Sequence, residues 1–173
     1  VEQNHQHLFQ NDAPDTQMTA QLNKNFSRQE LRTAMMQLKK NKTPGEDNVP
    51  YEFLQQIPSS GREVILRLFN VIWNSGRLPT AWKHSIILPI PKAGKDLRQP
   101  TSYRPISMTS TICKLMERMV TDRLMWYLEK FHRLNKVQSG FRKGRSTADQ
   151  INRLQDYINR HLRNKGHVLA VFI

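Results

Sequence analysis

Two prolines inside an apolar run restrict what residues 82–105 can form. The run SIILPIP at 85–91 has the length and the β-branched content of a strand. Because proline has no N–H to donate to a ladder, Pro89 and Pro91 place such a strand at a sheet edge. KAGKD at 92–96 supplies turn residues, and YRPI at 103–106 starts a return. The sequence therefore predicts a β-hairpin.

The predicted hairpin carries four cations at or near its tip: Lys92, Lys95, Arg98 and Arg104. Because like charges repel, either water solvates them or a polyanion binds there. Residues 83–145 hold 14 Lys and Arg against four Asp and Glu, a net charge of +10 out of the chain's +13. So dense a basic segment is typical of nucleic-acid-binding proteins. Binding to a membrane surface is disfavoured, because the cations alternate with turns instead of following one amphipathic helix.

Helical periodicity dominates the remaining chain, and the fold class we predict is α+β, predominantly helical. Apolar residues recur at helical spacing in four segments, 27–40, 61–74, 109–131 and 147–165. Ser27 with Glu30 has capping-box spacing, and Ser75-Gly76 is a stop signal for the second helix. Trp82 is expected to pack in the core or to anchor a hinge, and the single cysteine, Cys113, to be a buried thiol.

Two loops are candidates for nucleic-acid contact. In the first, KTPGEDN at 42–48, Gly45 permits a positive φ, Asp47 is expected to cap a short helix at 51–55, and Lys42 is available for phosphate. The second, LNKVQSGFRKGR at 134–145, interleaves an aromatic ring with cations and glycines, which suits contact with a single strand or a heteroduplex. A solvated loop with Phe141 turned into the core is the alternative.

Both ends of the sequence differ from its centre. Residues 1–25 are polar and aperiodic, which predicts a linker or a loosely docked arm. His5 and His7 have no other plausible ligand nearby, so we expect no metal site there. Residues 167–173 form an apolar run typical of a buried strand, and its abrupt end suggests that the chain is part of something longer. No apolar run approaches the length of a transmembrane helix.

Three blocks taken in order resemble the reverse transcriptases of non-LTR retrotransposons, which are related to those of group II introns. They are KTPGED at 42–47, the pair ILPIPK at 87–92 and YRPIS at 103–107, and QSGFRKGRST at 138–147. The resemblance covers residues 26–173. It implies a polar arm or linker at 1–25, the fingers region at 26–166, and the first palm strand at 167–173, truncated before the family's first catalytic aspartate.

The resemblance also implies roles for individual residues. Lys92 and Arg104 would bind the triphosphate of the incoming nucleotide. The expected template and primer contacts are Lys42, Gln138, Gly140, Phe141, Arg142, Lys143 and Arg145. The implied partners are an RNA template, a DNA primer, a deoxynucleoside triphosphate, and the palm and thumb of the parent chain, with nuclear residence expected from the family.

The same resemblance leaves this segment without the catalytic centre. Two-metal transfer needs palm carboxylates to hold Mg²⁺, and we assign no catalytic or metal-binding residue here. The expectation is a fingers portion of an RNA-directed DNA polymerase that is inactive in isolation. The alternative is a domesticated, non-catalytic RNA-binding or protein-interaction module that retains the fingers fold.

Overall fold

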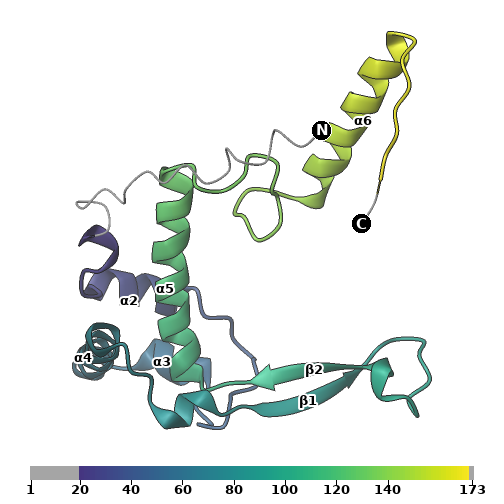
Figure 1. Cartoon of the computed structure of the whole chain (residues 1–173). Helices are drawn as coiled ribbons and strands as arrows, with labels where there is room; N and C mark the ends of the chain where they lie inside the picture. Colours follow the sequence, from purple (N-terminus) through teal and green to yellow (C-terminus); the bar gives the residue numbers. More distant parts are fainter. Residues whose placement is uncertain (1–19, 172–173) are drawn as a thin grey trace. The chain divides into compact units, whose positions relative to one another are not determined.

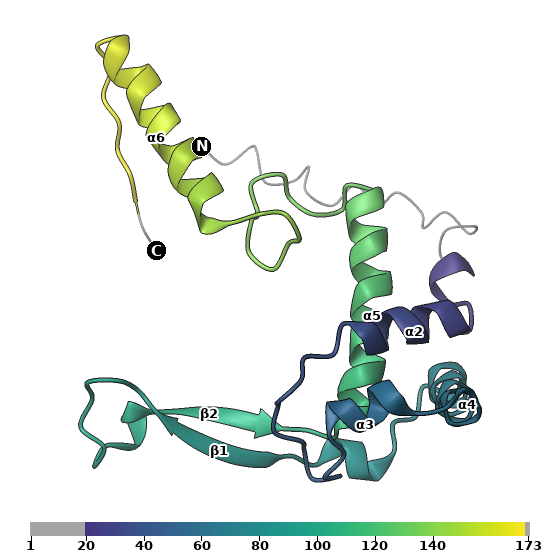
Figure 2. The same ribbon diagram turned by 180° about the vertical axis from the view of Figure 1, so that it is seen from behind.

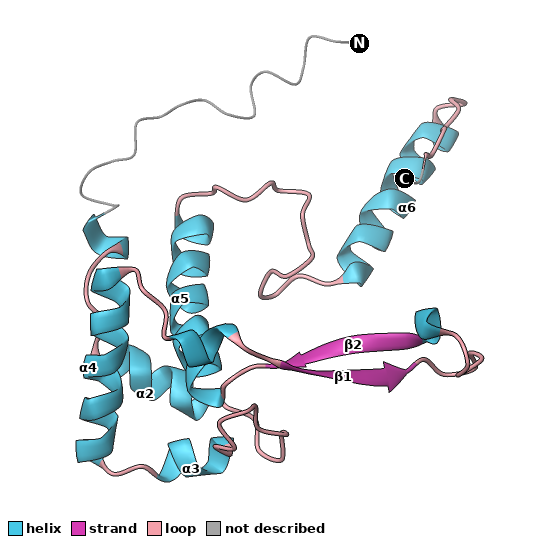
Figure 3. Cartoon of the chain, turned by 60° about the horizontal axis from the view of Figure 1, so that its bottom comes forward, coloured by secondary structure: helices cyan, strands magenta, loops and turns pink. Residues whose placement is uncertain are grey.

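The computed structural model describes residues 20–171. Residues up to Trp126 form one compact unit, the first unit, and residues from Tyr127 form the second. The described elements are α2 (Arg28–Met36), α3 (Tyr51–Gln56), α4 (Ser59–Ser75), η2 (Thr80–Lys83), β1 (Ile86–Pro91), η3 (Pro100–Ser102), β2 (Tyr103–Met108), α5 (Thr111–Lys130) and α6 (Thr147–Arg163). The described part is thus mostly helical with one two-stranded antiparallel sheet, drawn in magenta in Figure 3, which confirms the α+β class.

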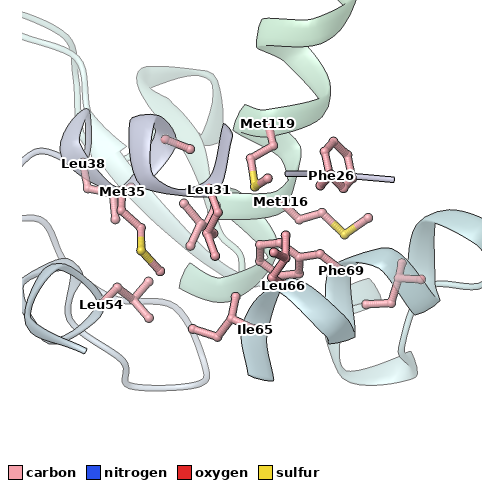
Figure 4. Close-up of a cluster of buried hydrophobic side chains, with 13 residues drawn as sticks. Phe26, Leu31, Met35, Leu38, Leu54, Ile65, Leu66, Phe69, Met116 and Met119 are labelled. Atoms are coloured by element: carbon pink, nitrogen blue, oxygen red, sulfur yellow. The ribbon is translucent and has the colours of Figure 1, made fainter. Parts of the chain in front are cut away.

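The hydrophobic core lies where α2, α3 and α4 meet the N-terminal half of α5 (Figures 1 and 2). Leu31 and Phe69 are almost fully buried, and Figure 4 shows their side chains close to Met116. Trp82 packs against this core with its ring edge-on to Phe69, at a centroid distance of 6.2 Å, which confirms its predicted role. The first unit therefore has a core that can hold its loops and hairpin in place.

Local signals in the sequence set the ends of the helices. Ser27 and Glu30 form the predicted capping box, and Gly76 ends α4 with a φ of 64°. The first helix is shorter than predicted, ending at Met36 instead of near residue 40. The amide of Gln55 in α3 accounts for this early end, because it donates to the carbonyls of Met35 and Leu38 in place of a further helical turn.

The predicted hairpin is confirmed and extends away from the helices of the first unit (Figure 1). Pro89 lies directly opposite Pro105. Lys92 donates its N–H to the Ser102 carbonyl at 2.8 Å, so by the alternation of antiparallel ladders the proline pair occupies a non-hydrogen-bonded position. The missing N–H groups would have pointed outward, so the prolines leave the ladder intact and disfavour a third strand at either edge.

The loop at 42–48 is anchored differently from the prediction. Asp47 does not cap α3, whose N-cap is Pro50. Its Oδ2 accepts hydrogen bonds from the Ser110 hydroxyl and the Thr111 N–H, both at 2.7 Å, at the start of α5. Gly45 is required for space and not for a positive φ, since a Cβ there would lie 2.0 Å from the Thr109 carbonyl oxygen. The Gly-x-Asp pattern therefore joins this loop to the junction between β2 and α5.

Arg123 of α5 holds the described end of the N-terminal arm. Its guanidinium donates to the carbonyls of Leu22, Lys24 and Asn25 and to the Glu30 carboxylate, and it stacks 4.3 Å above the Phe26 ring. Residues 22–25 are thus held against α5, more firmly than the linker or loosely docked arm that the sequence predicts. The prediction for residues 1–19 lies outside the described part of the chain.

The second unit contains the end of α5, the loop at 131–146 and α6. The predicted helix α6 begins with a Ser146–Asp149 capping box, but none of its residues is buried. Residues 167–171 form no strand, in contrast to the prediction, and the Leu169 side chain is 91% exposed. An apolar strand needs a neighbouring strand for its backbone groups, and the described residues provide none there. No described helix has the length and apolar character to cross a membrane.

Candidate nucleic-acid interface

The hairpin places Lys92 and Arg104 on the same face. Arg104 pairs with Ile90 across the ladder, and Lys92 follows Ile90 by two residues in register with Ser102. Side chains two apart on a strand, and those directly opposite each other, share a face of the sheet. Both cations therefore belong to the face that carries Ile86, Leu88 and Ile106, on which the strand positions other than Arg104 are apolar.

The turn beyond Lys92 is held by its own hydrogen bonds. The Lys92 Nζ donates to the Thr101 carbonyl at 2.8 Å, which leaves two of its three donors for a ligand. Arg98 pairs with Asp96 at 3.1 Å, and the Tyr103 hydroxyl donates to the Leu97 carbonyl. Arg104 makes no salt bridge with any described residue. Arg98 is thus engaged by Asp96, whereas Arg104 and two of the Lys92 donors remain for an anion.

The loop at 134–145 presents Phe141 to solvent. The Phe141 side chain is fully exposed and its φ is 59°, a backbone region that a bulky residue rarely adopts. This arrangement excludes the alternative in which the ring turns into the core. Gly140, Lys143 and Arg145 lie in the same loop, and the two cations have no ion pair among the described residues. An exposed ring between cations is suited to stacking on a base.

Arg142 is engaged within the loop itself. Its Nε and Nη2 bind the two oxygens of Glu129 at 2.8 and 2.6 Å, and its Nη1 reaches the carbonyls of Asn135 and Gln138. The hydrogen bond from Arg142 lowers the pKa of Glu129, and the same bond raises the pKa of Arg142. These contacts hold the loop in shape, and the template contact that the resemblance implies for Arg142 stays a prediction.

Gln150 is a second anchor, and it was missed in the sequence. Its amide donates to the Val137 carbonyl at 2.7 Å and to the Ser139 hydroxyl, which ties the first turn of α6 to the loop. Gln138 donates to the Gly140 carbonyl at 3.3 Å. A single glutamine in a helical pattern gives no signal of such a contact, so sequence reasoning could not have identified Gln150.

Lys42 lies in the first unit, apart in sequence from the loop just described. The Asn41 N–H donates to Glu52 Oε1 at 2.6 Å, which fixes the chain next to Lys42 and lowers the pKa of the Glu52 carboxyl. The Lys42 side chain lines a cavity together with residues of α5. The candidate residues therefore fall into three groups: the hairpin face, the loop at 134–145, and Lys42.

Comparison with known proteins identifies the family. The family model for reverse transcriptase (RNA-dependent DNA polymerase) matches residues 90–173. The chain is 37% identical over 145 residues to the probable RNA-directed DNA polymerase from transposon BS of Drosophila melanogaster. The chain belongs to the non-LTR retrotransposon reverse transcriptases. This confirms the predicted resemblance.

Other members of the family align over the same stretch. The RNA-directed DNA polymerase from mobile element jockey is 29% identical over 84% of this chain, and the probable polymerase from transposon X-element is 32% identical over 83%, both from Drosophila melanogaster. The chain spans about 16% of the length of each of these reverse transcriptases and of the transposon BS protein. It therefore represents part of a reverse transcriptase.

The acidic residues of this reverse transcriptase segment do not fit the Mg²⁺ used by the family. Asp47 is bound at the start of α5, Asp96 by Arg98, and Asp149 by the Ser146 cap. Within residues 20–171, no three His, Cys, Asp or Glu side chains form a group that could hold a metal ion. These carboxylates serve as caps and turn contacts, whereas Mg²⁺ sites in proteins are built from carboxylates that converge on the ion.

Proposed function

We propose that this chain forms the fingers region and the start of the palm of an RNA-directed DNA polymerase. In this role it binds the RNA template, the DNA primer and the incoming deoxynucleoside triphosphate. The proposal is carried by one observation, the placement of Lys92 and Arg104 on a shared, largely apolar face of the hairpin. A nucleotide has an apolar base and an anionic triphosphate, and this face offers a partner to each. Fixed cations also stabilise the charge that shifts during phosphoryl transfer.

The loop at 134–145 supplies the template contacts in this proposal. The exposed Phe141 ring stacks on a base, and Lys143 and Arg145 reach phosphates. Gln138 donates to the carbonyl of Gly140, which precedes Phe141, and Arg142 acts as a positioning residue through Glu129. The same features would serve a non-catalytic RNA-binding module, so RNA binding alone does not separate the two functions.

We test the proposal in the polypeptide that carries the complete polymerase domain. Lys92→Ala and Arg104→Ala each remove a hydrogen bond to a charged group, worth about 1.5–3 kcal/mol. This corresponds to a loss of about 10- to 150-fold in kcat/KM for the nucleotide. Affinity for an RNA–DNA template-primer, measured by fluorescence anisotropy, should change by less than about threefold.

Lys95→Ala is the matched control, because it removes the same charge from the turn of the same hairpin. We expect its nucleotide kinetics to stay close to wild type. If Lys92→Ala and Arg104→Ala weaken template-primer binding as much as nucleotide use, the hairpin is a general basic patch and the RNA-binding module becomes the better account.

A finer part of the proposal concerns the 173-residue segment alone. We infer that it does not polymerise DNA, because its aspartates at 47, 96 and 149 are committed to caps and a turn, and two-metal transfer needs free carboxylates. Primer extension with Mg²⁺ should give no product above background. Template-dependent extension by the purified segment would refute this inference.

A further inference from the structure

A cavity of about 560 Å³ lies in the first unit, beside the end of α2 and the exposed side of α5. Four of the side chains that line it are cationic: Lys39, Lys42, Lys114 and Arg118. The first two come from the segment after α2, and the other two lie one helical turn apart on α5. No residue of the hairpin lines this cavity, and all of its lining residues belong to the first unit.

The cations around the cavity repel one another with little compensation. Lys114 and Arg118 are spaced i, i+4, at which like charges destabilise a helix. None of the four cations forms a salt bridge with a residue that the structure describes. Glu117 is the one carboxylate in the lining, which leaves a net charge of +3 around the cavity. Such an arrangement favours an anionic ligand, because binding relieves the repulsion.

The remaining donors of the lining suit phosphate oxygens. Arg118 donates through Nη1 to the Gln37 side chain at 3.1 Å, which orients the guanidinium and leaves its other N–H groups for a ligand. The single O–H of Thr121 is already donated to the Glu117 carbonyl at 2.8 Å, and Tyr51 contributes a half-buried aromatic ring. The cavity thus combines one oriented guanidinium, three lysines without a salt bridge to a described residue, and one ring.

We propose that this cavity binds the phosphate backbone of a single-stranded nucleic acid. Two cations from a loop and two from a helix can address successive phosphates of one strand, more than a single small anion needs. Within the proposed function, which this inference deepens, the cavity is an additional contact for the RNA template, beyond the hairpin and the loop at 134–145.

The test compares two variants of the chain with equal loss of charge. In the cavity variant, Lys39, Lys42 and Lys114 are changed to Gln. In the control variant, the exposed residues Arg67, Arg77 and Lys83, which do not line the cavity, are changed to Gln. Binding to a fluorescein-labelled 20-nucleotide oligouridine is measured by anisotropy from about 50 to 300 mM salt.

Each phosphate contact to a single strand contributes about −0.7 to the slope of log K against log salt. The cavity variant should therefore lose about 2 from that slope and bind about a hundredfold more weakly near 0.1 M salt. The control variant should stay within about threefold of wild type, since distant exposed charges are screened at this ionic strength. Equal losses in the two variants would overturn the assignment of the cavity.

Two further measurements keep the result interpretable. If the cavity variant unfolds, Lys42→Gln alone should still weaken binding about fivefold, and unchanged affinity would overturn the inference. Inorganic triphosphate should displace the oligonucleotide only at high concentration. Displacement at micromolar triphosphate, with oligonucleotide affinity unaffected in the cavity variant, would assign the cavity to a free polyphosphate instead. A wild-type chain that binds no oligonucleotide at 50 mM salt would overturn the proposed function itself.

Discussion

Replacing Asp47 by alanine should destabilise the first unit through the contacts that this side chain makes at the start of α5. Asp47 Oδ2 accepts from the Ser110 hydroxyl at 2.7 Å, the Thr111 N–H at 2.7 Å and the Ile112 N–H at 3.3 Å. The variant leaves these donors without their acceptor at the start of α5. This carboxylate therefore ties the loop to the start of α5, in addition to the core packing of Leu115, Met116 and Met119.

The magnitude follows from three physical contributions. Loss of a helix cap costs about 1 kcal/mol, and loss of an anion at a partly buried helix N-terminus up to about 2 kcal/mol. The Ser110 O–H, in a residue only 6% exposed, would also lose its acceptor, at about 1–3 kcal/mol, although the Ser110 oxygen still accepts from the Cys113 N–H. Since these contributions overlap, we expect about 3 kcal/mol, or about 6–12 °C in Tm. Asp47→Asn keeps an acceptor oxygen and should lose only about 1 kcal/mol.

Urea unfolding followed by tryptophan fluorescence measures this effect, because Trp82 packs on Phe69 in the core of the first unit. Glu46→Ala is the control, since it removes an exposed charge from the adjacent position. If Asp47→Ala and Glu46→Ala differ by less than about 0.5 kcal/mol, the proposed anchor at the start of α5 is wrong.

Three further predictions concern single side chains. Burial raises the pKa of Glu30, but hydrogen bonds from Ser27 and Arg123 together lower it by more than burial raises it. The pKa of Glu30 is therefore below its ordinary value of 4.5. Ionised Glu30 should contribute its whole stabilising free energy above about pH 5 and lose it as the pH falls below 4.5. The urea midpoints of Glu30→Gln and of the wild type should therefore converge in acid. Burial raises the pKa of Cys113 from 9.0 to about 11, and Ellman's reagent at pH 8 should react about a hundredfold more slowly with the native chain than with the urea-unfolded one. Arg142→Ala should speed amide hydrogen exchange across residues 134–145, whereas the neighbouring Lys143→Ala should not.

Each of these three has a contradicting result. Parallel pH profiles of wild type and Glu30→Gln would show that Glu30 titrates normally. Equal thiol reactivity in the folded and unfolded chains would contradict the burial of Cys113. Unchanged exchange in Arg142→Ala would mean that other contacts, such as those of Gln150, hold the loop without it.

Much of the fold was predictable because its signals are local. The capping boxes at Ser27 and Ser146, the αL stop at Gly76 and the hairpin turn each depend on residues within a few positions of one another. The prolines of β1 also marked an edge strand correctly, since their effect on the ladder is independent of the rest of the chain. The family was readable from three such local blocks in order.

The candidate site was predictable only in part. The positions of its cations along the sequence were evident, but which of them pair with a carboxylate was not. Arg142 and Lys143 are adjacent and equally basic, yet only Arg142 meets Glu129, 13 residues earlier. The four cations around the cavity also come together through packing of α5 against the segment after α2, and no local pattern announces it.

The sequence by itself determined most of the secondary structure, the basic character and the family, because these follow from short-range periodicity, turn chemistry and ordered motifs. Only the tertiary structure decided what Asp47 and Gly45 are for. Their partners at residues 109–112 lie more than 60 positions along the chain, and the packing that brings them together depends on a core built from four helices. A side chain's local pattern restricts its backbone, whereas its function depends on what packing places beside it.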